Sequence, residues 1–113
     1  MKKDSHDLCM KQNWELWEIL VPAEDMYLKE IPIELHQKWD ESVRKITGGL
    51  TILKPVKGQW VSPCQKIFKE KMIPVRIACS EIDIKTIAKM TLHYYNQEQV
   101  MFYKVSNEVY FIG

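Results

Sequence analysis

The chain has 113 residues, a length typical of one domain. Its 16 basic and 15 acidic residues give a formal net charge of +1, so no overall field favours nucleic acid or an acidic membrane as a partner. No apolar run approaches the roughly 20 residues that span a bilayer, and the first residues are polar, so we expect no secretory signal and a cytoplasmic protein.

The cysteines support neither a disulfide framework nor a zinc site. Cys9, Cys64 and Cys79 are odd in number and widely spaced, and no Cys or His pair has the spacing of a structural zinc site. Cys79 ends an apolar run and is expected in the core, whereas the other two are expected at the surface. We therefore predict no metal and no cofactor.

Residues 1–12 are polar and predict a flexible N-terminal arm ahead of a single domain at 13–113. Residues 14–21 predict a strand, because apolar side chains alternate onto both of its faces. One face carries Trp17, Ile19 and Val21, and the other carries Trp14, Leu16 and Leu20. A strand that is apolar on both faces is expected at the centre of a sheet. Glu18 interrupts the second face.

Two segments have the periodicity of amphipathic helices. Pro32 is well placed to open the first, and Gly48-Gly49 supplies the left-handed stop that commonly ends such a helix. Ser80 is a suitable N-cap for the second helix, which we expect to end at Asn96-Gln97. The two apolar faces consist of Leu35, Trp39, Val43 and Ile46, and of Ile84, Ile87, Ala88, Thr91 and Tyr95.

The remaining strands are predicted at residues 50–53, 58–61, 67–79, 100–105 and 109–112. Pro55 predicts a bend or an edge position between the first two of them. A polar turn at Ser62–Gln65 predicts a β-hairpin with the long strand that follows, and Ser106-Asn107 predicts a tight turn before the last strand.

The resulting order, β-α-β-β-α-β with an extra C-terminal strand, is typical of a ferredoxin-like α+β fold. Two helices would cover one face of an antiparallel sheet and leave the other face open. That open face would carry Trp14, Leu16, Leu20, Met72 and one of Phe102 and Tyr103. Leaving each large apolar group in water costs about 1.5 to 3 kcal/mol. A contiguous apolar patch usually marks a partner surface, so we predict a homodimer through this face.

Four short motifs resemble a family of small uncharacterised bacterial proteins. They are the helical Trp39-Asp40, Gly49-Leu50-Thr51, Gly58-Gln59-Trp60, and the late Gln97-Glu98-x-Val100. The resemblance spans residues 14–112, contains no catalytic motif, and implies a ferredoxin-like fold with no established activity.

Glu18 and Arg76 each place a charge on an otherwise apolar strand face, and both fall on the predicted open face. If their strands are neighbours, they would form a charged pair that is costly to desolvate unless it is well hydrogen-bonded. Such a pair indicates an anchor for an acidic ligand, a device that fixes the register of a dimer, or a structural salt bridge at the interface. We predict a ligand-binding set of Glu18, Arg76, Trp14 and Tyr103.

His36 and Asp40 lie four residues apart on the first helix and can meet on its surface. A histidine oriented by a carboxylate can act as a general base, although a non-catalytic surface pair has the same spacing. No serine or cysteine nucleophile is indicated.

The favoured interpretation is a dimerising binding module that holds a small organic ligand on its open sheet face. One alternative is a small-molecule enzyme of the dimeric ferredoxin-like barrel type, with His36 as base and Arg76 as anion anchor. The other is a structural domain without a ligand.

Overall fold

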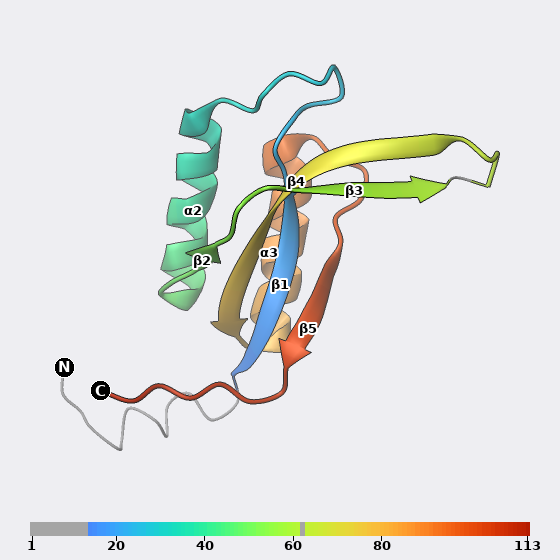
Figure 1. Cartoon of the computed structure of the whole chain (residues 1–113). Helices are drawn as coiled ribbons and strands as arrows, with labels where there is room; N and C mark the ends of the chain where they lie inside the picture. Colours follow the sequence, from blue (N-terminus) through green and yellow to red (C-terminus); the bar gives the residue numbers. More distant parts are fainter. Residues whose placement is uncertain (1–13, 62) are drawn as a thin grey trace.

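The computed structural model describes residues 14–61 and 63–113, so the predicted arm at 1–12 and Cys9 lie outside the described residues. The elements are β1 (Glu15–Pro22), α2 (Ile33–Thr47), β2 (Thr51–Ile52), β3 (Val56–Val61), β4 (Ile67–Cys79), α3 (Glu81–Tyr95) and β5 (Phe102–Ser106) (Figure 1). With β2 and β3 counted as one interrupted strand, this is the β-α-β-β-α-β order of the ferredoxin-like fold.

The sheet is antiparallel throughout, with strand order β2-β4-β1-β5, and β3 also pairs with β4. The predicted central position of the first strand is confirmed, because β1 has a partner on each side. The interruption predicted at Pro55 is also confirmed: residues 53–55 belong to no strand and separate β2 from β3. Proline lacks the N–H that a continuous ladder requires.

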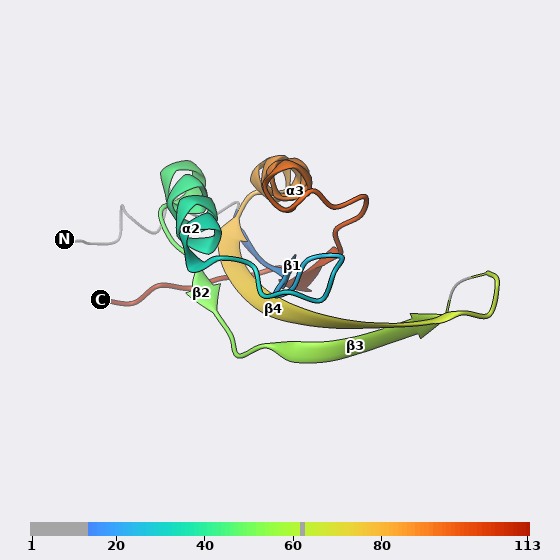
Figure 2. The ribbon, with the colours of Figure 1, turned by 90° about the horizontal axis from the view of Figure 1, so that it is seen from above.

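Helices α2 and α3 lie side by side on one face of the sheet, as Figure 2 shows from above. The core between them and the sheet contains Trp17, Ile19, Val21, Trp39, Val43, Val75, Ile77, Cys79, Ile84, Ile87, Ala88 and Tyr95. A buried hydrogen bond joins the two helices, in which Trp39 Nε1 donates to Thr91 Oγ1 at 2.9 Å. Neither helix, nor any other in the described part of the chain, is long and apolar enough to cross a membrane.

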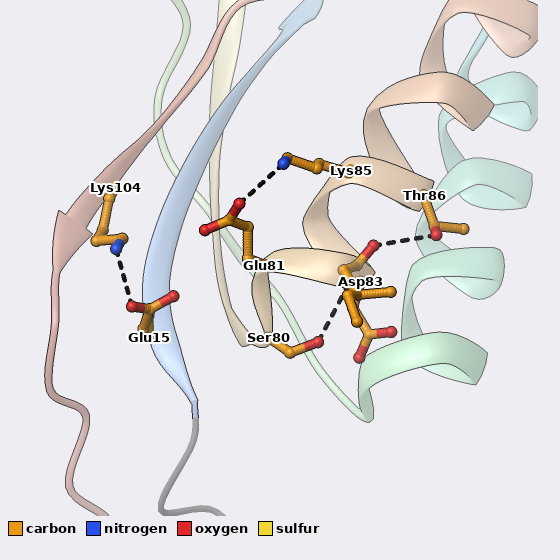
Figure 3. Close-up of polar contacts among 8 residues, drawn as sticks. Glu15, Ser80, Glu81, Asp83, Lys85, Thr86 and Lys104 are labelled. Carbon is orange, nitrogen blue, oxygen red and sulfur yellow. Dashed lines mark hydrogen bonds and ion pairs between the residues drawn. The ribbon is translucent and has the colours of Figure 1, made fainter.

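The predicted helix ends are confirmed. Gly48 ends α2 with φ +92°, and its N–H donates to the carbonyl of Arg44. Ser80 caps α3 by accepting a hydrogen bond from the N–H of Asp83 at 3.2 Å (Figure 3). Asn96 ends α3 in the left-handed conformation, with φ 51°, which asparagine tolerates better than most residues.

The predicted C-terminal strand at 109–112 is wrong, since Val109 to Ile112 form no strand. A two-residue hairpin turn requires positive φ at its central residues, and neither Ser106 nor Asn107 adopts it. The Ser106 hydroxyl instead bonds to the backbone of Glu108. The segment continues without strand pairing, and the rings of Phe111 and Trp14 meet in a T-shaped arrangement with their centroids 6.2 Å apart.

The predicted hairpin is confirmed as a two-stranded ribbon made by β3 and the first half of β4. It projects past both helices (Figures 1 and 2). Its outer residues are therefore exposed on both faces of the ribbon. We call this ribbon the arm, which is distinct from the predicted N-terminal arm. Its described exposed apolar side chains include those of Val56, Val61, Ile67 and Phe68.

Candidate functional site

One row of side chains crosses the sheet face that the helices leave uncovered. The strand register places Arg76 opposite Glu18, Glu18 opposite Tyr103, and Thr51 on the other side of Arg76. Residues directly opposed on antiparallel strands point to the same face. Each of β2, β4, β1 and β5 thus contributes one residue to this row, which we call the polar row.

Glu18 lies at the centre of the polar row and is 7% exposed. Arg76 donates its Nε–H to Glu18 Oε1 at 2.9 Å, and the Tyr103 hydroxyl donates to Oε2. Burial alone would raise the pKa of Glu18, but the bonds from Tyr103 and Arg76 outweigh it and hold that pKa below its ordinary value. The buried carboxylate is therefore ionised and paired at both oxygens.

Arg76 is the accessible member of the pair, with 43% of its side chain exposed. Within the described residues its guanidinium makes one hydrogen bond, through Nε. Because a guanidinium carries five N–H donors in a planar fork, its outer N–H groups remain available. The arrangement can receive an acidic group from outside the sheet.

The other two predicted ligand residues have different outcomes. Tyr103 faces the open side, next to Glu18, while Phe102 packs toward the core, with its ring 6.2 Å from that of Trp17. Trp14 precedes β1, four residues from Glu18, which corresponds to roughly 13 Å along an extended chain. The structure therefore brings together three of the four residues, and Trp14 lies beside the C-terminal segment instead.

His36 lies on the other side of the sheet. Its Nδ1 is 2.7 Å from the Tyr95 hydroxyl. It lines a hollow together with Val75, the neighbour of Arg76 on β4, and consecutive strand residues point to opposite faces. Within one chain, His36 and Arg76 therefore lie on opposite faces of the sheet and do not share a site. The alternative of a dimeric enzyme with His36 as base and Arg76 as anion anchor stays a prediction.

His36 and Asp40 lie close enough for each to influence the pKa of the other. Burial lowers the pKa of His36, and the Asp40 carboxylate opposes this effect in part. Burial raises the pKa of Asp40, while His36 and Arg44 oppose it. Their catalytic role stays a prediction.

Sequence reasoning missed two partners in these sites. The helical spacing of Tyr95 predicts a core position but carries no information on the direction of its hydroxyl group. Thr51 joins the polar row through the pairing of β2 with β4, and this pairing depends on a long-range register.

The two described cysteines, Cys64 and Cys79, are both free thiols. Cys79 is buried, as predicted, and burial raises the pKa of its thiol to about 12. Cys64 is exposed, also as predicted. Among residues 14–61 and 63–113, no three His, Cys, Asp or Glu side chains gather as metal ligands would.

No family model matches the chain, so the predicted resemblance to a small bacterial family stays a prediction. No curated protein matches it either. Solved structures do. A phage SAM lyase in complex with S-methyl-5′-thioadenosine aligns with a TM-score of 0.65 and 15% identity, over 85% of this chain and 83% of that one. The fold is ferredoxin-like.

Two divalent cation tolerance proteins share this fold. CutA1 from a psychrotrophic Shewanella species aligns with a TM-score of 0.64 and 14% identity, over 91% of this chain and 88% of that one. Its counterpart from Thermus thermophilus gives a TM-score of 0.60 and 7% identity, over 81% of this chain and 82% of that one. At these identities the likeness concerns the ferredoxin-like architecture.

Proposed function

We propose that the protein is a self-associating binding module whose open sheet face is covered by a second copy, with the homodimer as the smallest assembly. The observation that carries this proposal is the polar row: a buried, fully paired carboxylate beside an arginine whose outer edge is exposed. Burying charged groups inside an apolar face costs desolvation free energy unless the charges are paired. We therefore assign this pair the role of fixing how one copy is positioned on the other.

The arm gives independent support for self-association. An isolated two-stranded ribbon is marginally stable in water, and this one exposes Val61 at 57% and Ile67 at 60%. Packing against another chain would remove such side chains from water at about 25 cal/mol for each Å² of apolar surface. A second copy is the partner that is present whenever the protein is present.

The ligand of the module would be a small organic acid held by Arg76. The outer N–H groups of the guanidinium match the two oxygens of a carboxylate. Tyr103, 39% exposed on the next strand but one, offers a ring surface beside it. This proposal keeps the predicted binding role of Arg76 and gives Glu18 the task of orienting it.

Sedimentation velocity with paired variants tests the assembly. Ile67→Lys places a charge on the arm, whereas Ile82→Lys makes the same change at an exposed position of α3, where the isoleucine is 78% exposed. We expect the first variant to sediment more slowly than wild type and the second to match it. Equal sedimentation of all three proteins would contradict a role of the arm in assembly.

Thermal shifts with a panel of small mono- and dicarboxylates test the ligand. S-methyl-5′-thioadenosine belongs in the panel as an uncharged comparison, since a protein of similar fold holds it. Arg76→Gln should abolish any stabilisation by acids, while Arg44→Gln, an exposed arginine on α2, should retain it. If no acid stabilises the wild type, the structural domain without a ligand becomes the better interpretation.

A further inference from the structure

A hollow of about 160 Å³ lies between α2 and the sheet, on the face opposite the polar row. It is lined by Val21, Ile33, His36, Trp39, Asp40, Ile52, Ile73 and Val75. Six of these eight side chains are apolar. The hollow is separate from the open face, so binding in it does not depend on the proposed function.

The size of the hollow fits a compact molecule. An apolar cavity of about 150 Å³ accepts a benzene ring, which corresponds to a body of about six heavy atoms. Two residues of its lining, Ile33 and Ile52, are 62% and 54% exposed, so the hollow opens toward water at its rim. A ligand could enter without rearrangement of the core.

Asp40 is the acidic group in this lining. It is half-buried, and within the described part of the chain its carboxylate has no hydrogen-bond or ion-pair partner. Arg44 and His36 influence it through space alone. A partly desolvated carboxylate without a partner is stabilised by any cationic donor that reaches it.

His36 does not supply that cation. Its Nδ1 is engaged with the Tyr95 hydroxyl at 2.7 Å, and burial lowers its pKa. The imidazole is therefore mainly uncharged at neutral pH, and Asp40 carries the formal charge among the eight lining residues.

We propose that this hollow binds a small organic amine, with an aromatic or alicyclic body among Trp39, Ile52 and Ile73 and an ammonium group at Asp40. The apolar lining selects the body, and the unpaired carboxylate selects the charge. An organic acid of the same shape would be repelled by Asp40.

The experiment is a titration of the ¹⁵N-labelled protein, followed by amide shifts, with three probes of one shape: benzylamine, benzyl alcohol and benzoate. We expect benzylamine to bind at least about tenfold more tightly than benzyl alcohol, because a charge-assisted bond is roughly twice as strong as a neutral one. Benzoate should bind least. The shifts should concentrate at residues 33–40, 52 and 73–75.

Two variants on the same helix make the result specific. Asp40→Asn removes the carboxylate at the hollow, and Glu41→Gln removes the adjacent one, which is exposed and lies 3.9 Å from Lys45. The first should abolish the preference for benzylamine, and the second should preserve it. Circular dichroism verifies that both variants fold. Equal binding of amine and alcohol, equal effects of the two variants, or shifts confined to other elements would overturn the proposal.

Discussion

Arg76 on β4 donates a hydrogen bond to Glu18 on β1 from the directly opposed position of the neighbouring strand, with Nε and Oε1 2.9 Å apart. The two partners differ in their surroundings. The Glu18 side chain is 9% exposed, and that of Arg76 is 43% exposed. The carboxylate depends on its protein partners, whereas water can reach the guanidinium.

This difference predicts unequal effects of removing each partner. Arg76→Leu leaves a buried carboxylate with one donor, and we expect the free energy of unfolding to fall by about 1–3 kcal/mol. At chain concentrations too low for self-association, Glu18→Leu leaves a cation that water can solvate, and it should cost less. Urea unfolding of the single and double variants measures both values and their coupling. Equal costs would indicate that the pair behaves as an ordinary surface ion pair.

The buried bond between the helices gives a second prediction. Thr91→Val removes the acceptor of the Trp39 indole N–H, and an unsatisfied buried donor costs about 1–3 kcal/mol. Thr86→Val is the matched control on α3, because Thr86 is exposed and its hydroxyl bonds to the Ile82 carbonyl. The control should change the free energy of unfolding by less than about 0.5 kcal/mol. Similar values for both variants would mean that the Trp39 bond contributes nothing.

Stability should fall on acidification in part because of His36. Burial lowers the pKa of His36 in the folded state, so the unfolded chain binds more protons as the pH drops toward the ordinary value. Asp40 opposes this shift in part, Arg44 acts on Asp40, and the Tyr95 hydroxyl bonds to the ring. The stabilisation that comes with an uncharged His36 is therefore fully present above pH 6.5, the ordinary pKa of histidine, and is lost as the pH falls below that value.

The variant His36→Gln should show a shallower fall of the unfolding free energy than the wild type as the pH drops from about one unit above to about one unit below that ordinary value. His93→Gln is the control, since His93 is exposed in the last turn of α3 and its loss leaves the His36 contribution in place. An unchanged slope in His36→Gln would rule out this source of acid sensitivity.

The stop of α2 gives a fourth prediction, with neighbouring glycines as test and control. Gly48 has φ +92°, a conformation that costs an L-residue about 1–2 kcal/mol. A Cβ at Gly49 meets nothing within 4 Å, and its φ is not positive. Thermal unfolding should show a clear loss for Gly48→Ala and less than about 0.5 kcal/mol for Gly49→Ala. A larger loss of stability for Gly49→Ala than for Gly48→Ala would mean that Gly48 is not the residue in the left-handed conformation.

Local sequence patterns predict the helices and strands of this fold well, because the residue types that end these elements have specific backbone properties. Gly48 and Ser80 are residue types with a specific backbone role, and Pro55 cannot continue a ladder. The alternation around Ile19 and the helical period around Trp39 each identify a buried face. These features require no knowledge of distant contacts.

The errors arose where distant contacts decide the outcome. Nothing local in residues 109–112 shows that the turn at Ser106 fails to reverse the chain. The hydroxyl of Tyr95 contacts His36, which lies 59 positions away in the sequence. Helical spacing alone does not reveal this contact. The contact between Glu18 and Arg76 is predictable because the ferredoxin-like order of elements permits β1 and β4 to be neighbours, as they are.

The mass of the wild-type protein in solution tests the central claim most directly. Light scattering coupled to size exclusion, at micromolar chain concentration, should return an integer multiple, two or more, of the 13.4 kDa chain mass. Burial of the open face and the arm against another copy requires this result. A mass of 13.4 kDa that does not change with concentration would contradict the claim.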